Sequence, residues 1–436
     1  MDAWNRRQFF SLAGAATVGV AAGCAGMGVS TSVKSGTGPI AFWSNHPGQS
    51  SAVENELISR FERQFPGLSA ELIDAGAGYD DVAMKFNASL TGTDVPDVVV
   101  LSDVWWFNFA LNGTIAPLDD LFGEVGVDPS DYVDTLLADY AFNGQHYALP
   151  YARSTPLFYY NKPVWERVGL PDRGPHSWQE FDEWGPQLQR VVGPRKWAHG
   201  WANANSGLSW TFEGPDWTFG GSYSQQWNLT FTDPATIAAG TYLRDSIYSK
   251  GYAVVGNDVN NEFATGILAS TVTTTGLLAG ITETARFDFG VSALPTGPGG
   301  APGCPTGGAG LAIPTKLSDQ RKLNALRFIA FVTNPAQSAY FSQSTGYLPV
   351  RKSTLDDPSE KKYLAENPRA QVAVTQLQHT RPQDYAEVFL PGGERIIGAG
   401  LESIGLQRAD VRTTFARINQ QLQVVLDRQI KPKLPS

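Results

Sequence analysis

Two groups of tryptophans lie beside acidic or small polar residues, and these side chains are the ones best suited to bind a ligand. In the stretch SDVWW, the carboxylate of Asp103 stands next to the indoles of Trp105 and Trp106. A carboxylate beside aromatic faces suits a sugar or a quaternary ammonium group. The same residues also have ordinary structural roles, because Asp is favoured at helix N-caps and tryptophans cover sheet edges. We expect at least one of the two tryptophans to be a core residue.

The segment 199–223 places three more tryptophans among Gly, Asn and Ser with no clear period. They are Trp201, Trp210 and Trp217. We interpret the segment as loops that hold aromatic plates at a binding cleft, and Trp210 is the first candidate to reach that cleft. The alternative is a loop-rich subdomain with a small aromatic core of its own.

The sequence lacks the familiar catalytic motifs. It contains no phosphate-binding GxxxxGK[ST] loop, no HExxH, no GxSxG and no CxxC. The five histidines are scattered without metal-ligand spacing. The carboxylate pairs Asp80-Asp81 and Asp119-Asp120 are typical of solvated helix starts, so a glycosidase acid/base pair is not indicated. The pattern favours binding over turnover, and it indicates neither a cofactor nor a metal.

Composition narrows the class of protein further. The chain has 436 residues and a formal net charge of −9, which argues against nucleic acid as a partner. Of its two cysteines, Cys24 belongs to the N-terminal segment and Cys304 stands alone, so no disulfide framework exists. Cys304 lies in a Gly/Pro-rich segment, and we interpret it as a packed small residue.

Residues 1–23 are interpreted as an export signal peptide. A twin-arginine pair, Arg6-Arg7, precedes an apolar run that is too short to span a bilayer comfortably. Ala21-Ala22-Gly23-Cys24 resembles the bacterial lipobox, in which Cys24 is lipidated, but the usual Leu three residues earlier is missing. Residues 24–38 then form a lipid-anchored tether on the outer face of the cytoplasmic membrane. The alternative is a hydrophobic N-terminal helix without this function.

The chain after the tether begins with a repeated strand-helix pattern. Three strands and two helices are predicted over Ile40–Ser44, Ser50–Phe65, Ala70–Ile73, Asp80–Leu90 and Asp97–Leu101. Ser51 and Glu54 have the spacing of a capping box at the start of the first helix. Alternation of strands and helices indicates a doubly wound α/β lobe.

This topology predicts where a ligand binds. In open α/β sheets, ligands lie outside the carboxyl ends of the strands. Three loops occupy those ends, at Asn45–Gly48, Gly76–Tyr79 and Ser102–Trp106. Side chains on these loops are therefore candidates for the binding site.

The stretch Leu149–Lys162, LPYARSTPLFYYNK, is interpreted as the first crossing between two lobes. Pro150 and Pro156 exclude a continuous helix, and the aromatic run after Pro156 favours an extended strand. The polar residues Arg153, Ser154 and Thr155 would lie at the mouth between the lobes. The alternative is an ordinary core strand with solvated flanks.

A second α/β pattern follows, and the chain is predicted to cross between the two lobes twice more. The second crossing is predicted at Gly308–Pro314 and the third at Thr345–Lys352. We predict that residues 39–152 and 308–345 form lobe 1, and that residues 153–307 and 346–436 form lobe 2. The elements expected along this part are helices at Ser177–Val192, Pro234–Ser249, Asn260–Leu268, Leu323–Thr333 and Pro335–Gln343, strands at Ser270–Gly276 and Phe287–Leu294, a loop at Pro295–Gly307, and a helical C-terminal part.

Several blocks together resemble the extracellular solute-binding proteins of ABC importers. They are Phe263–Gly276, Leu294-Pro295, Gly307–Pro314 and above all Ala325–Arg351, ALRFIAFVTNPAQSAYFSQSTGYLPVR. Within that family the chain is most similar to the glycerol-3-phosphate and glycerophosphodiester-binding branch, in particular its mycobacterial lipoprotein. The resemblance implies a two-lobed periplasmic-binding-protein fold that closes by hinge motion. It also implies a monomer that delivers its ligand to a membrane permease driven by a separate ATPase.

The resemblance also implies a set of ligand-binding residues. These are Tyr79, Asp103, Ser154, Trp210, Thr274, Gly308, Tyr347 and Arg395. Two positions depart from the family pattern. Thr274 stands where serine is common, which keeps the hydroxyl, and Glu387 stands where a basic residue is expected.

A hypothesis for recognition follows from these residues. The phosphodiester would accept hydrogen bonds from Arg395, Tyr347 and the Gly308 backbone, and the glycerol hydroxyls would bind Ser154. Asp103 and the tryptophans would supply the negative charge and the aromatic faces for choline. An acidic residue beside a phosphate argues against a dianionic monoester such as glycerol-3-phosphate.

Three alternatives to this function stay open. The nearest is a binding protein for a neutral di- or oligosaccharide, for which Arg395 would matter less. The second is an exported lipoprotein enzyme, such as a glycoside hydrolase or a phosphodiesterase. The third is a purely structural envelope protein, against which the hinge-like crossings argue.

Overall fold

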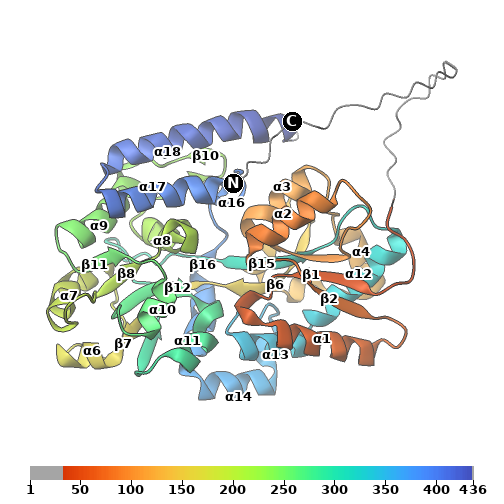
Figure 1. Cartoon of the computed structure of the whole chain (residues 1–436), viewed down its shortest axis with the longest axis horizontal. Helices are drawn as coiled ribbons and strands as arrows, with labels where there is room; N and C mark the ends of the chain where they lie inside the picture. Colours follow the sequence, from red (N-terminus) through yellow and green to blue (C-terminus); the bar gives the residue numbers. More distant parts are fainter. Residues whose placement is uncertain (1–32, 435–436) are drawn as a thin grey trace, which may run out of the picture. The chain divides into compact units, whose positions relative to one another are not determined.

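The computed structural model describes residues 33–434. The predicted signal peptide and the lipidation site Cys24 lie outside the described residues, as does most of the predicted tether. The described residues contain two separate five-stranded sheets, which Figure 1 shows as two groups of strands with helices packed around each. This arrangement confirms the predicted two-lobed α/β fold.

The first sheet is built mainly from the N-terminal strands, as predicted. Its strand order is β2-β1-β3-β15-β6, with β1 parallel to β2 and β3, and β15 antiparallel to both of its neighbours. The strands are β1 (Ile40–Ser44), β2 (Ala70–Asp74), β3 (Val98–Ser102), β6 (Ala148–Ser154) and β15 (Gly307–Ala312). Strand β3 is buried along its whole length, which fits its run of Val and Leu.

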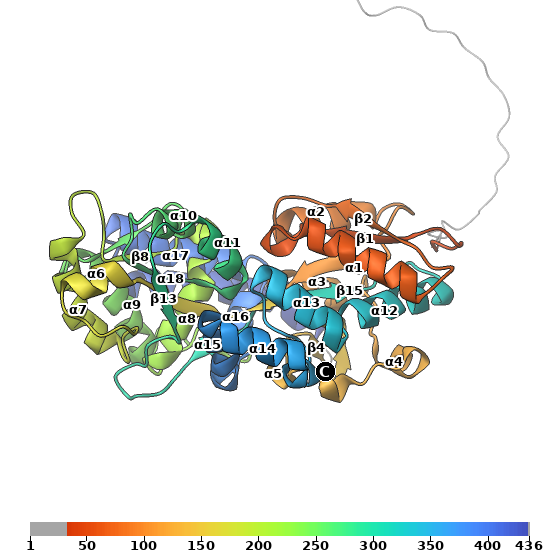
Figure 2. The same cartoon turned by 90° about the horizontal axis from the view of Figure 1, so that it is seen from below.

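Seven helices of the described part of the chain surround this sheet, and most of them lie in the chain segments that connect its strands. They are α1 (Ser51–Gln64), α2 (Tyr79–Ser89), α3 (Asp103–Leu111), α4 (Asp119–Val125), α5 (Asp134–Ala138), α12 (Asp319–Val332) and α13 (Pro335–Thr345). Helix α12 comes from the later part of the chain and lies beside α1, as Figure 2 shows. Phe61 of α1 packs against Phe328 of α12 with ring centroids 5.1 Å apart. The two helices therefore close one face of the sheet together.

The second sheet has the strand order β11-β8-β12-β7-β13. Its strands are β7 (Pro156–Asn161), β8 (His199–Trp201), β11 (Ala253–Val255), β12 (Ser270–Thr274) and β13 (Phe289–Ser292). Its surrounding helices are α6 (Lys162–Arg167), α7 (Trp178–Val191), α8 (Leu208–Thr218), α9 (Pro234–Tyr248), α10 (Val259–Ala264), α11 (Leu278–Thr284), α14 (Pro358–Glu366), α15 (Pro368–Gln376), α16 (Tyr385–Val388), α17 (Gly393–Gln407) and α18 (Val411–Val425). The C-terminal part is helical, as predicted.

The chain first passes between the sheets at Pro156, whereas Pro150 lies inside β6. Strand β6 ends at Ser154 in the first sheet, and β7 begins at Pro156 in the second. The short strand β14 (Cys304–Pro305) comes just before β15 and pairs in parallel with β16 (Thr380–Arg381), from the C-terminal part of the chain. Cys304 is buried with an unpaired thiol, which confirms the interpretation as a packed residue. The exact lobe boundaries stay a prediction.

The interpretation of 199–223 as loops is wrong. The segment contains strand β8, and residues 208–218 form helix α8. Ten of the eleven residues of α8 are buried. A helix buried on nearly every side has no polar face, so the sequence carries no amphipathic period.

The predicted capping box of the first helix is also wrong. Ser50, not Ser51, is the N-cap of α1, and its side chain makes no capping hydrogen bond. Glu54 is instead buried, and its carboxylate accepts hydrogen bonds from Ser44 Oγ at 2.7 Å and Tyr151 Oη at 3.3 Å. His46 Nδ1 lies 2.6 Å from the same carboxylate. Contacts of Glu54 with Ser44 at the end of β1 and with Tyr151 inside β6 take the place of the local cap.

No helix among residues 33–434 is long and apolar enough to cross a membrane.

We predict that Gly308→Ala destabilises the fold. Gly308 in β15 has a φ of +111°, and a Cβ there would lie 2.0 Å from the carbonyl oxygen of Ala152 in β6. The free energy of unfolding should fall by about 2 kcal/mol or more, because backbone strain and a steric clash add. Chemical denaturation measures this change.

The control is Gly280→Ala in α11, where a Cβ meets no heavy atom within 4 Å. It should leave stability unchanged or raise it by up to about 1 kcal/mol. Equal stability of the Gly308→Ala variant and the wild type would contradict the prediction.

Candidate functional site

Seven of the eight residues predicted for the site line one cavity of about 460 Å³. They are Tyr79, Asp103, Ser154, Trp210, Thr274, Gly308 and Tyr347. Most of them stand where a strand ends or a helix begins: Tyr79 opens α2, Asp103 opens α3, Ser154 ends β6 and Thr274 ends β12. A cavity of this size fits a small-molecule ligand. Because its lining comes from elements of both sheets, it lies between them.

Two of the three loops predicted from the first sheet line this cavity. Gly78 and Tyr79 come from the loop after β2, and Ser102, Asp103 and Val104 come from the end of β3. The loop after β1 lines a neighbouring cavity instead, together with Tyr79 and Tyr347. The hydroxyls of these two tyrosines lie 3.3 Å apart.

Asp103 belongs to a buried ion-pair cluster. Arg153, which is fully buried in β6, donates from one guanidinium nitrogen to Asp103 Oδ1 at 2.5 Å and from the other to Asp139. Tyr140 Oη donates to the same Asp103 oxygen at 3.0 Å, and Gln383 Nε2 donates to Asp103 Oδ2 at 3.0 Å. Both carboxylate oxygens of Asp103 are therefore already hydrogen-bonded within the protein.

The two carboxyl groups of the cluster share one guanidinium, and burial shifts the protonation of both. Burial raises the pKa of Asp139 to about 7, against the opposing effect of the Arg153 charge. Burial also raises the pKa of Asp103, again opposed by Arg153. Isolated buried carboxylates are costly, and sharing one cation leaves part of that cost uncompensated.

Trp210 lies against the start of β15, where a hydrogen bond fixes its indole and the absence of a side chain at Gly307 leaves room for the ring. Its indole Nε1 donates to the backbone oxygen of Thr306 at 2.9 Å. A Cβ at Gly307 would lie only 2.5 Å from the indole ring. Of the three tryptophans in 199–223, Trp201 is a core residue and Trp217 lines a different cavity. Trp210 alone among them lines the cavity between the sheets.

Trp105 and Trp106 of the SDVWW stretch lie in different surroundings, one partly exposed and the other in the core. Trp106 is fully buried, which confirms that one of the pair is a core residue. Trp105 is partly exposed and donates from Nε1 to Asp80 Oδ1 at 2.6 Å. Neither lines the cavity that contains Asp103, although Trp105 lines the cavity next to it.

Arg395 is the one predicted site residue that the structure places elsewhere. Its side chain is 65% exposed and pairs with Asp80 at 2.7 Å. It lines the neighbouring cavity of about 590 Å³, which shares Asp80, Glu387 and Glu394 with the first. Arg395 is therefore near the predicted site but already has an ionic partner.

Several lining residues were not predicted from the sequence. The turn Asn205–Gly207 lies just before α8, and Gln383 and Glu394 lie in the C-terminal part. Glu387 was singled out only as a departure from the family pattern, yet it lines the cavity too. No pattern in the sequence marks Gln383 or Glu394, because both reach the cavity through the tertiary fold.

The wall of the cavity is acidic. Four carboxyl side chains line it, those of Asp80, Asp103, Glu387 and Glu394. Among residues 33–434, no Lys, Arg or His side chain lines it. The remaining polar groups are hydroxyls and amides, which donate hydrogen bonds without adding charge. The site can therefore hold polar and cationic groups better than a group with two negative charges.

No group of three or more His, Cys, Asp and Glu in the described part of the chain could hold a metal ion.

The model of a family described as bacterial extracellular solute-binding protein matches residues 56–368, more than half of the chain. The chain belongs to this family. Its members are extracellular and bind small molecules for ABC transporters in the membrane.

Relatives of this solute-binding protein include two with a stated ligand. The sn-glycerol-3-phosphate-binding periplasmic protein UgpB of Escherichia coli K12 is 26% identical over 386 residues, which cover 84% of this chain and 87% of that protein. UgpB from Mycobacterium tuberculosis, whose crystal structure was solved in complex with glycerophosphocholine, has 71% sequence identity to this chain, and the two structures superpose with a TM-score of 0.88. The match covers 91% of this chain and all of that one.

More distant solute-binding proteins share the fold alone. The maltose-bound MalE3 of T. maritima is 21% identical, with a TM-score of 0.75 over 89% of this chain and 100% of that one. This likeness supports the two-lobed architecture and says nothing of the ligand.

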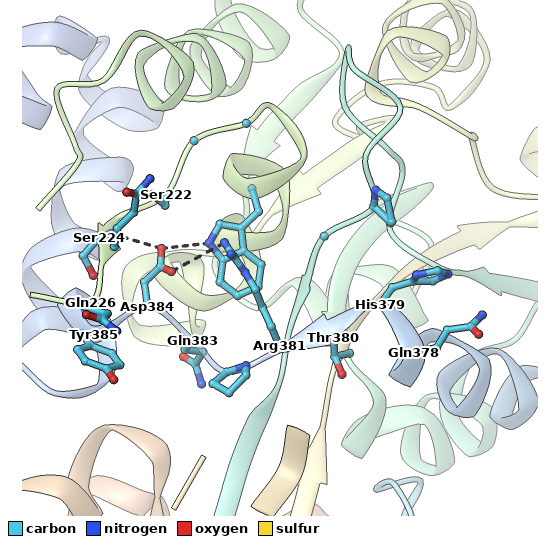
Figure 3. Close-up of a pocket in the computed structure, with 17 residues that line it drawn as sticks. Ser222, Ser224, Gln226, Gln378, His379, Thr380, Arg381, Gln383, Asp384 and Tyr385 are labelled. Carbon is cyan, nitrogen blue, oxygen red and sulfur yellow. Dashed lines mark hydrogen bonds and ion pairs between the residues drawn. The ribbon is translucent and has the colours of Figure 1, made fainter. Parts of the chain in front are cut away.

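A larger cavity of this solute-binding protein shares one lining residue, Gln383, with the cavity between the sheets. It measures about 1060 Å³, and Figure 3 shows Asp384 between Ser224 and Arg381 among the residues that line it. Arg381 stacks over the ring of Trp217, and Asp384 accepts a hydrogen bond from Trp217 Nε1 at 3.0 Å. Apart from Gln383, the residues that line it are distinct from those of the first cavity.

We predict that Asp139 makes stability depend on pH between about 4 and 7. Its pKa is about 7 when folded, against about 4 in an unfolded chain, so the folded state binds a proton more tightly in this window. The contribution of this carboxyl to the free energy of unfolding therefore falls as pH rises through the window and is constant above it. Asp139→Asn removes that contribution.

Thermal unfolding at several pH values between 5 and 8 measures the effect. The melting temperature of Asp139→Asn should fall less with rising pH than that of the wild type. The exposed Asp120→Asn variant is the control and should keep the wild-type slope. Equal slopes for Asp139→Asn and the wild type would contradict the shift.

Proposed function

We propose that this protein is the substrate-binding component of an ABC importer for glycerophosphodiesters such as glycerophosphocholine. The observation that carries the proposal is the 71% identity to the M. tuberculosis protein, whose solved structure contains glycerophosphocholine. The match covers 91% of this chain and all of that one. Relatives at this identity commonly keep the chemistry of their site, although the fold alone would not fix the ligand.

The charge of the cavity supports a diester over a monoester. A phosphate monoester carries close to two negative charges near neutral pH, whereas a phosphodiester carries one. No cationic side chain lines the cavity among the described residues, so a second negative charge on the phosphate would lack a partner there. The hydroxyls of Ser154, Thr274 and the Tyr79–Tyr347 pair can donate hydrogen bonds to a singly charged phosphate or to glycerol.

The aromatic and acidic groups support a cationic head group. Trp210 presents an indole to the cavity, and the carboxyl groups lie in the same wall. A quaternary ammonium binds over electron-rich rings and beside negative charge. The eight residues proposed for binding are those predicted from the sequence, with Arg395 acting from the neighbouring cavity.

The remaining parts of the proposal concern the environment of the protein. We place the lobe boundaries as predicted, at residues 39–152 with 308–345 and at 153–307 with 346–436, and propose that the lobes close on the ligand about the β6–β7 crossing. The protein acts as a monomer, held by lipid on Cys24 and delivering its ligand to a permease with a separate ATPase. It captures its ligand without chemical conversion.

Isothermal titration with a panel of ligands tests this function. We expect saturable binding of glycerophosphocholine, at least about 10-fold weaker binding of glycerol-3-phosphate, and no binding of maltose, because only the first is a singly charged diester with a cationic head group. Binding of maltose alone would reassign the cavity to sugars. Release of free choline or glycerol during incubation would show an enzyme instead.

A further inference from the structure

Glu387 is a buried carboxyl without a hydrogen-bond partner. It lies on the short helix α16, and its side chain is 1% exposed. Among the described residues, neither of its carboxylate oxygens has a partner within hydrogen-bonding geometry, although the buried hydroxyl of Ser209 lies close enough to lower its pKa in part. Its side chain lines both the cavity between the sheets and the neighbouring one. A buried polar group of this kind is costly unless something binds it.

The other carboxyl groups of the cavity differ from Glu387, because two are paired with arginines and the third is only half-buried. Asp103 is bonded by Arg153, Tyr140 and Gln383, so its two oxygens are occupied. Asp80 pairs with Arg395 and accepts from Trp105. Burial and the Asp80 charge raise the pKa of the half-buried Glu394, and the Arg395 charge opposes them in part.

The surroundings of Glu387 are mostly acidic. Asp384 precedes it in the chain, Asp103 faces it from α3, Glu213 from α8 and Glu394 from α17, and the buried Tyr223 lies nearby. The cations in the region are engaged elsewhere, Arg153 with Asp103, Arg395 with Asp80 and Arg381 over Trp217. Burial first, and then the Glu394 charge, hold the pKa of Glu387 well above its usual value.

We propose that Glu387 is the specificity-determining counterion for the cationic head group of the ligand. This inference rests on the proposed function and adds to it the residue that selects a diester with a cationic head group over one with a neutral head group. Asp103 lines the cavity, but both of its oxygens already accept hydrogen bonds within the protein. Glu387 is the buried carboxyl of the lining that can take a new partner. Trp210 supplies an aromatic face in the same cavity.

Binding of a cation against Glu387 should change the protonation of its carboxyl. A cation placed against Glu387 favours its charged form, so a proton passes from the Glu387 carboxyl to the buffer as the ligand binds. Affinity for the cationic ligand then increases with pH. A phosphate placed against Glu387 would have the opposite effect, with proton uptake and weaker binding at higher pH. The sign of the effect therefore shows which end of the ligand meets Glu387.

The experiment is isothermal titration of the purified protein with two ligands, glycerophosphocholine and glycerophosphoinositol, whose head groups are cationic and neutral. Each titration is run in two buffers of different ionisation enthalpy, which gives the number of protons exchanged. Glu387→Gln keeps the shape of the side chain but never carries a charge. The matched control is Glu360→Gln, which changes a buried carboxyl on α14 away from the cavity.

We expect the wild type and Glu360→Gln to release protons on binding glycerophosphocholine, and Glu387→Gln to release none. Glu387→Gln should bind glycerophosphocholine at least about 10-fold more weakly and glycerophosphoinositol within about 2-fold of the wild type.

Proton uptake by the wild type would overturn the inference, and this result needs no variant to fold. Equal weakening of both ligands, or no weakening, in a folded Glu387→Gln protein would overturn it as well and leave the proposed function standing. Failure of the wild type to bind either ligand would contradict the proposed function itself, and the inference with it.

Discussion

The structure around the cleft depends on one buried arginine. Arg153 stands near the end of β6, where the chain leaves the first sheet, and its guanidinium binds Asp103 at the start of α3 and Asp139. Removing a guanidinium from water costs several kcal/mol, which is offset only while the carboxylates stay in place. The cluster therefore fixes the end of β6 against the start of α3, and with them Ser154 and the cavity wall. Because it holds two carboxyl groups for one cation, it does not make that wall basic.

The part of the fold that could be predicted is the part governed by local pattern. The buried Val and Leu run of β3, the amphipathic period of α1 and the prolines of β6 and β7 each signal their structure within a few residues. The site could be located for a related reason. Parallel strands end at one edge of a sheet, so the loops after β2 and β3 had to meet, and the family resemblance added the residues on the crossings.

What the sequence could not show depends on contacts between distant segments. Helix α8 is buried on nearly every side, so its sequence has no polar face to reveal it. The pairing of Asp103 with Arg153 joins residues 50 positions apart, and Asp80 and Arg395 are 315 positions apart. Glu54 gives up a local cap for partners in β1 and β6. These charge pairings decide which carboxyl groups can meet a ligand, and only the folded chain reveals them.

The central claim is that an acidic wall, with Glu387 as its unpaired carboxyl, receives the cationic end of a zwitterionic diester. A crystal structure of the complex with glycerophosphocholine tests this claim most directly. The account predicts the trimethylammonium group against Glu387, within about 6 Å of an aromatic ring such as Trp210, and the phosphate among the hydroxyls of Ser154, Tyr79 and Tyr347. A phosphate lying against Glu387, or a ligand bound outside this cavity, would contradict it.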